Sequence, residues 1–121
     1  MSITTHTLDA GRWLEYFESI GPALDGSLVT IEVMDEQIGD QVEAERLPLQ
    51  AIGYDPNDNV MEIAVGGRGL RYPVLLRHFI SRPQTIAIEE TGTVAPSAIL
   101  VTDADGQRTL IRLFEPTALE A

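Results

Sequence analysis

The chain has 121 residues, of which 44% are hydrophobic and 22% charged, a size and composition typical of one compact domain. It contains no Lys and no Cys, and its eight basic residues, all Arg, stand against 19 acidic residues for a net charge of -11. These absences exclude P-loops, Schiff-base lysine enzymes, thiol nucleophiles, disulfides, zinc fingers and iron–sulfur clusters. The acidity opposes binding to a phosphate backbone, so we expect no nucleic-acid partner.

Helical membrane spans are not expected, because charged residues interrupt every hydrophobic stretch before it reaches the roughly 18 apolar residues that a span requires. Residues 1–7 do not combine a basic segment with an apolar run, as a secretory signal would. The sequence therefore predicts a soluble, cytoplasmic protein that begins here and does not associate with membranes.

Charge is distributed unevenly along the chain. Residues 1–60 carry 12 acids and two Arg, whereas residues 61–121 carry seven acids and six Arg. A segment without any acid, residues 63–88, holds four of these basic residues: Arg68, Arg71, Arg77 and Arg82. We expect these four side chains to recognise an anion or an acidic partner. Opposite charges on identical chains also favour a homo-oligomer.

Residues 9–20 are predicted to form one helix. Its apolar residues recur at helical spacing and are Trp13, Phe17 and Ile20. The carboxylate of Asp9 is expected to cap the first turn, and Gly21 with Pro22 is expected to end the helix.

From residue 28 onward, apolar and polar residues alternate with the period of a strand. The predicted strands lie within residues 28–34, 47–54, 60–65, 70–80, 85–89, 98–102 and 108–114. Turn residues at 55–59 and 103–106 predict two hairpins. Residues 35–46 are either an exposed connection or a hairpin arm. Residues 70–80 could open a short helix at Pro73, but their alternation favours a strand with Pro73 at an edge or a bulge.

This pattern predicts an α+β protein that is mainly β. We expect the N-terminal helix to pack on a curled antiparallel sheet, or on a small, partly open SH3-like or Sm-like barrel, of six to seven short strands. Residues 1–121 are predicted to form a single domain, with a β-rich part over residues 28–114 and a loose tail over residues 115–121.

No catalytic residue, cofactor or metal site is predicted from the motifs. Residues 103–106 resemble part of a calcium loop, but the first and twelfth ligand positions would be Val101 and Arg112, which cannot serve. Two His are too few for a specific metal site. The chain also lacks the Gly-x-Ser-x-Gly turn that exposes a serine nucleophile.

A small-molecule pocket is the other site that the sequence allows. Its candidate lining residues are Tyr54, Tyr72 and His78, to which Glu32 and Asp35 would add negative charge. His78 falls in the apolar set of its predicted strand, so a packed, hydrogen-bonded imidazole is the simpler interpretation of that residue.

Residues 28–35, 38–49 and 105–114 resemble a family of small bacterial proteins known as a domain of unknown function. The resemblance spans nearly the whole chain and includes Trp13 and Phe17 in the predicted helix. It implies a bacterial origin and supports the fold, and it implies no cofactor or reaction.

Taken together, these patterns predict a non-enzymatic binding or accessory protein that acts through surface charge, with a protein partner or a second copy of itself. The alternative is a barrel that binds a small molecule, or a small enzyme with an acidic pocket.

Overall fold

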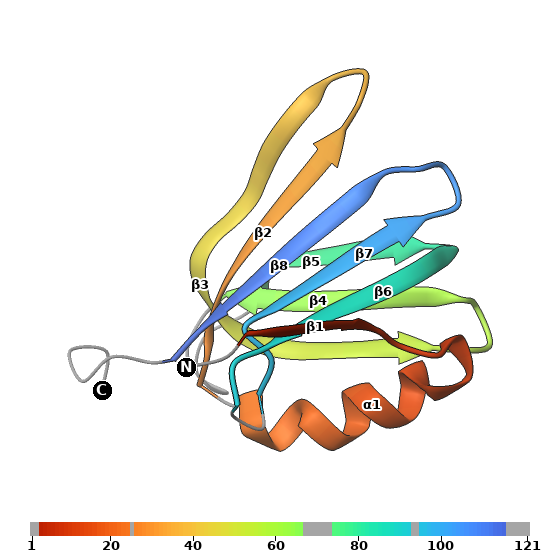
Figure 1. Ribbon diagram of the computed structural model, residues 1–121. Helices are drawn as coiled ribbons and strands as arrows, with labels where there is room; N and C mark the ends of the chain where they lie inside the picture. The colour runs from red at the N-terminus through yellow and green to blue at the C-terminus, as the bar shows by residue number, and fades with distance from the viewer. Residues whose placement is uncertain (1–2, 25, 67–73, 93–94, 116–121) are drawn as a thin grey trace.

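The computed structural model describes residues 3–24, 26–66, 74–92 and 95–115. These residues form one eight-stranded antiparallel sheet, curled but not closed, with a single short α-helix along one side (Figure 1). The predicted fold class is therefore confirmed. Within the described ranges, no helix is long and apolar enough to cross a membrane.

The strands follow the order β1-β6-β7-β8-β2-β3-β4-β5 across the sheet. Their bounds are β1 (Thr4–Thr7), β2 (Leu28–Asp35), β3 (Gly39–Asp55), β4 (Val60–Gly66), β5 (Val74–Ser81), β6 (Pro83–Glu90), β7 (Ala98–Asp103) and β8 (Arg108–Phe114). Helix α1 (Trp13–Ile20) is preceded by the 3-10 turn η1 (Ala10–Arg12) and followed by the 3-10 turn η2 (Gly21–Leu24).

Strand β3 is the longest and serves two different neighbours. Its first half pairs with β2 as far as Pro48, and its second half, from Leu49 onward, pairs with β4. Residues 35–46 are thus a turn and a hairpin arm, one of the two predicted alternatives. Because β3 changes partner along its length, its second half forms a second layer with β4 and β5, called the β3–β5 layer, behind the rest of the sheet (Figure 1).

The core fills the concave side of the curled sheet. Trp13, Phe17 and Ile20 are buried, as their spacing predicts, and α1 packs beside the second half of β3 (Figure 1). The alternating residues of the strands meet them from the sheet; among the fully buried ones are Val29, Ile31, Met61, Ile63, Ile86, Ile88, Ile99, Val101 and Ile111. Burial of each such side chain contributes about 1.5–3 kcal/mol relative to exposure, so this cluster holds the helix on the sheet.

The start of the helix differs from the prediction. The side chain of Asp9 makes no capping hydrogen bond, and its backbone carbonyl instead accepts from the N–H of Arg12 at 2.9 Å. The chain therefore forms a 3-10 turn before the helix, and the α-helix begins only at Trp13. Gly11 lies in that turn, where its low helix propensity is less costly than inside an α-helix.

The sheet has eight strands where six to seven were predicted, because β1 was not recognised. All four residues of β1 are exposed and three are Thr, so no alternation of apolar and polar residues marks the strand. Strand β5 confirms the strand interpretation over residues 74–80 and lies at the edge of the sheet. Pro73 itself lies outside the described residues.

Candidate functional site

The outer face of the β3–β5 layer carries a hollow with a volume of about 500 Å³. The strand registers place Gly53 of β3, Glu62 of β4 and Phe79 of β5 in one row across it. The residues around this hollow that matter for its chemistry are Gly53, Asp55, Asp58, Val60, Glu62 and Phe79. The concave side of the sheet is filled by the core, so this site lies on the convex surface.

The hollow exists because one residue of the row has no side chain. A Cβ placed on Gly53 would meet nothing within 4 Å. Phe79 stands at the other end of the row and is 56% exposed, because strand alternation buries its neighbour Ile80 and turns the phenyl ring outward. Glu62 lies between the glycine and the exposed ring, so the hollow has an open end at Gly53, a carboxylate in the middle and an aromatic ring at the other end.

Three carboxylates line this hollow. Glu62 accepts a hydrogen bond from a terminal nitrogen of Arg77 at 2.7 Å, and Asp55 accepts one from the backbone N–H of Asn57 at 2.9 Å. Asp58 adds a third carboxylate, so among the described residues the acids of the hollow outnumber the guanidinium of Arg77. Negative charge next to an aromatic face attracts cations.

Tyr54, a predicted pocket residue, borders this hollow but is tied to the core. Its hydroxyl donates to the side-chain oxygen of Asn59 at 2.7 Å. Its ring meets Trp13 edge to face, with centroids 5.2 Å apart. Tyr54 therefore helps to hold α1 and the β3–β4 turn together.

His78 lies on the concave face of β5, opposite Ile63 of β4. Burial lowers the pKa of this imidazole, and the charge of Glu43 opposes that effect. Tyr54 borders the hollow on the outer face of this layer, and His78 is not among the residues that line it. Tyr72 lies outside the described residues, so a pocket formed by Tyr54, Tyr72 and His78 stays a prediction.

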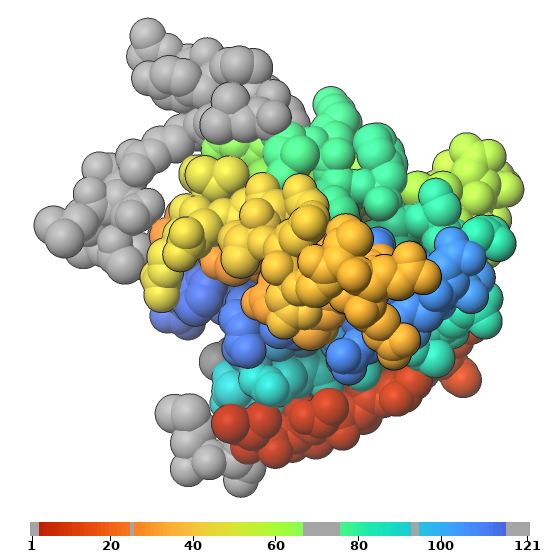
Figure 2. Space-filling model, turned by 90° about the horizontal axis from the view of Figure 1, so that it is seen from above, coloured from red at the N-terminus to blue at the C-terminus, as the bar shows by residue number. Residues whose placement is uncertain are grey.

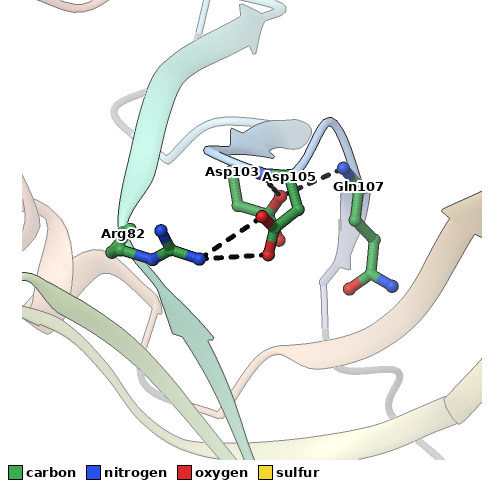
Figure 3. Close-up of polar contacts among 4 residues, drawn as sticks. All are labelled: Arg82, Asp103, Asp105 and Gln107. Carbon is green, nitrogen blue, oxygen red and sulfur yellow. Dashed lines mark hydrogen bonds and ion pairs between the residues drawn. The ribbon is translucent and has the colours of Figure 1, made fainter.

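Two of the four predicted anion-binding residues, Arg77 and Arg82, lie within the described residues, and both have carboxylate partners. Arg77 is paired with Glu62, and a terminal nitrogen of Arg82 lies 3.1 Å from Asp105 (Figure 3). Arg68 and Arg71 lie outside the described residues, so the role of the four as an anion site stays a prediction.

The acid-rich turn after β7 is organised by its own backbone. Asp103 accepts hydrogen bonds from the backbone N–H groups of Asp105 and Gln107 at 2.9 and 3.0 Å (Figure 3). The side chain of Gln107 donates to Asp35 at 3.1 Å, which joins this turn to the β2–β3 turn. Hydrogen bonds from Gln37, Gln107 and Ile38 hold the pKa of the Asp35 carboxyl below its usual range.

A second hollow of about 420 Å³ lies between β1 and α1. The sequence did not predict this hollow, because β1 shows no strand pattern. His6 in this groove lies 3.8 Å from Glu90. Burial, assisted by the charge of Glu90, raises the pKa of Tyr16 to about 12. The hydroxyl of Ser19 donates to the backbone carbonyl of Tyr16 at 2.7 Å, so it already has a partner within the helix.

Comparison with known proteins gives the family of this chain. The family of unknown function DUF5335 matches residues 4–121. The chain belongs to this family. The resemblance inferred from the strand and turn patterns is thus confirmed over nearly the whole chain.

One relative and the solved structures complete the comparison. An uncharacterized protein of Aquifex aeolicus (strain VF5) is 34% identical over 112 residues, which cover 92% of this chain and 93% of the relative. No solved structure matches the chain. The relative is itself uncharacterized, so the proposed function rests on the geometry of the surface.

Proposed function

We propose that this protein is a non-enzymatic binding protein and that the hollow beside Phe79 receives a cationic group of its partner. The observation that carries the proposal is the 56% exposure of the Phe79 side chain in one row with Gly53 and Glu62. Single exposed apolar side chains are common on protein surfaces. The ring of Phe79 is distinguished from them because it borders a hollow that carboxylates line.

The chemistry of the hollow favours a cation with an apolar stem. A cation over an aromatic face contributes about 0.5–1 kcal/mol at an exposed site. Asp55, Asp58 and Glu62 add long-range attraction, and Gly53 and Val60 leave an apolar surface for a methylene chain. An Arg or Lys side chain, or a small organic ammonium ion, meets these requirements.

Fixed charges in the hollow favour binding over catalysis. The carboxylate of Glu62 is held by Arg77, and that of Asp55 is held by a backbone amide. Both acids are therefore oriented by partners inside the protein, and they attract a cation as fixed charges. The proposal needs no proton transfer at either group.

The test is an NMR titration with two pairs of probes. Acetyl-arginine amide is compared with its neutral isostere acetyl-citrulline amide, and choline is compared with a neutral alcohol of similar size. We expect the cations, and not the neutral probes, to shift the signals of Gly53, Glu62 and Phe79. Preference for the arginine compound favours a protein partner, and preference for choline favours the small-molecule alternative.

Gly53→Leu is the variant that is expected to fill the hollow without disturbing the fold. Its Cβ meets no neighbour, so the fold is kept while the leucine fills the hollow and abolishes the cation-dependent shifts. Gly11→Ala, a second open glycine position outside the hollow, is the matched control and keeps them. Shifts that persist in Gly53→Leu, or that the neutral probes reproduce, contradict the proposal.

A further inference from the structure

Strand β5 is the last strand of the sheet and pairs only with β4 among the described residues. The N–H of Arg82 donates to the carbonyl of Asn59 at 2.9 Å, and these two residues are the next pair in the β4–β5 register. This bond shows which pairs along the two strands are hydrogen-bonded. Bonded and non-bonded pairs alternate along an antiparallel ladder. Leu76, His78 and Ile80 therefore bond to β4. The residues that direct their backbone N–H and C=O groups to the open edge include Arg77, Phe79 and Ser81.

This edge carries only part of the protection that is usual for a sheet edge. Such edges are short, charged, bulged or interrupted by Pro. The pairing of β5 with β4 is irregular between Val74 and Leu76, but it is regular from Leu76 to Ser81. Strand β5 has eight residues, of which Arg77 is the one Arg and none is acidic or Pro. Seen from above, β5 lies at the surface of the molecule (Figure 2). Residues 76–81 therefore offer a regular template on which another strand can form hydrogen bonds.

We propose that a second copy of this chain adds its β5 antiparallel to this β5, about a two-fold axis at His78. In this register Arg77 lies opposite the partner's Phe79, and Leu76 lies opposite the partner's Ile80. The two sheets become continuous, and backbone hydrogen bonds supply the affinity while the side-chain pairs set the register.

The charges of β5 favour this register over its neighbours. A two-fold axis at Arg77 would set two guanidinium groups directly opposite each other, which is destabilising. An axis at Phe79 would place Arg77 opposite the partner's Ser81 and would lose the contact between Arg77 and an aromatic ring. The axis at His78 pairs each Arg77 with the partner's Phe79 over residues 76–80, which lie beyond the irregularity between Val74 and Leu76.

The interactions that this pairing requires already occur within one chain. Arg46 lies over the ring of Phe114 at 4.1 Å, so an Arg–Phe contact across the sheet is compatible with this fold. Glu62 neutralises Arg77 at 2.7 Å, which reduces repulsion between the two Arg77 residues beside the axis. The net charge of -11 opposes self-association at most surfaces, and an edge strand without acids is where this repulsion is weakest.

Sedimentation velocity over a range of concentrations tests the pairing. The wild type is expected to shift from monomer to dimer as its concentration rises. Phe79→Lys sets like charges opposite each other and is expected to remain a monomer, whereas Phe79→Tyr keeps the ring and the dimer. Val42→Lys is the control. It also replaces an exposed apolar residue with Lys, at a position of β3 that is 59% exposed, and is expected to dimerise as the wild type does.

Cysteine cross-linking tests the register, because the chain has no Cys of its own. Two cysteines form a disulfide when their Cβ atoms are about 4 Å apart. His78→Cys is expected to give covalent dimers on oxidation, and Arg77→Cys and Phe79→Cys are not. A monomer at every concentration, equal behaviour of Phe79→Lys and Val42→Lys, or strongest cross-linking at residue 77 or 79 overturns the proposal.

This inference shares the ring of Phe79 with the proposed cation site, but a variant at Gly53 separates the two. Gly53→Leu fills the hollow on β3 and leaves the free edge of β5 untouched, so this variant is expected to dimerise normally. Loss of cation binding with an intact dimer, or the reverse, shows which of the two proposals has failed.

Discussion

Arg82 and Asp105 join the corner between β5 and β6 to the tip of the β7–β8 hairpin. One terminal nitrogen of the guanidinium lies 3.1 and 3.3 Å from the two carboxylate oxygens of Asp105 (Figure 3). The backbone of the same corner is also bonded, because the N–H of Ala104 donates to the carbonyl of Arg82 at 3.0 Å. Arg82 itself has a φ of 53°, in the left-handed region that favours glycine.

These observations predict that the backbone at residue 82 matters more for stability than its exposed ion pair does. Arg82→Gly loses the pair but relieves the left-handed strain, which costs about 1–2 kcal/mol in a non-glycine residue. Arg82→Ala loses the pair and keeps the strain. Urea unfolding is expected to find Arg82→Gly more stable than Arg82→Ala by about 1 kcal/mol.

Asp105→Asn is the control for the ion pair, because it leaves the backbone of residue 82 unchanged. It is expected to cost less than about 1 kcal/mol, the usual range for an exposed pair. If Arg82→Ala proves as stable as Arg82→Gly, the corner is not strained and the ion pair holds it.

His78 is predicted to make the fold less stable in mild acid. Burial lowers the pKa of its imidazole below 6.5, so the unfolded chain binds a proton more readily than the folded chain does. Stability is therefore fully present above pH 6.5 and falls as the pH drops through the lowered pKa. Chemical unfolding of His78→Gln is expected to depend less on pH over this window.

The matched control is His6→Gln, which removes the imidazole of β1 and retains the contribution of His78. A wild-type free energy of unfolding that does not decrease below pH 6.5, or a His78→Gln variant with an unchanged pH slope, would contradict this prediction.

Tyr16 is predicted to destabilise the fold in strong alkali. Burial, assisted by the charge of Glu90, raises its pKa from 10.0 to about 12. A phenol with a raised pKa contributes stability that is fully present below pH 10 and is lost as the pH rises through about 12. Tyr16→Phe is expected to resist alkaline unfolding better over this range.

Tyrosinate absorbance during an alkaline titration measures the same effect directly. Glu90→Gln is expected to move the late tyrosinate step to lower pH, and Tyr16→Phe is expected to remove it. A titration in which all three tyrosines ionise together would show that Tyr16 is not shielded in the groove.

Tyr54→Phe is predicted to weaken the fold without weakening cation binding. The hydroxyl of Tyr54 is used by Asn59 at 2.7 Å, so its loss is expected to cost about 0.5–1.5 kcal/mol in thermal or urea unfolding. The ring remains against Trp13, and the hollow keeps its open end. Reduced cation binding in a stable Tyr54→Phe protein would instead place the hydroxyl in the site.

The sequence by itself determined the local elements. The spacing of Trp13, Phe17 and Ile20 marked the buried face of the helix, and alternation marked the buried residues of β2 and β6. The turn residues at 55–59 and 103–106 marked two hairpins, and Asn59 and Gly106 adopt the positive φ that these turns need. Such signals are readable because periodicity and turn chemistry depend on residues close in the chain.

Tertiary structure decided the rest of the fold and the candidate site. Strand β1 is a strand because β6 pairs with it, and not because its own residues alternate. Arg77 and Arg82 formed a basic stretch in the sequence, but Glu62 and Asp105 meet them from other strands and turns. Pairing between distant residues leaves no periodic signal in a single sequence.

The exposure of Phe79 shows the same limit most clearly. Alternation predicted the inward set of β5, but it could not tell that Gly53, two strands away, would leave a hollow beside the outward phenyl ring. Composition gave the charge of -11 and excluded lysine and cysteine chemistry. Only the register of three strands placed an aromatic ring, a glycine and a carboxylate in one row, because register is set by packing across the whole sheet.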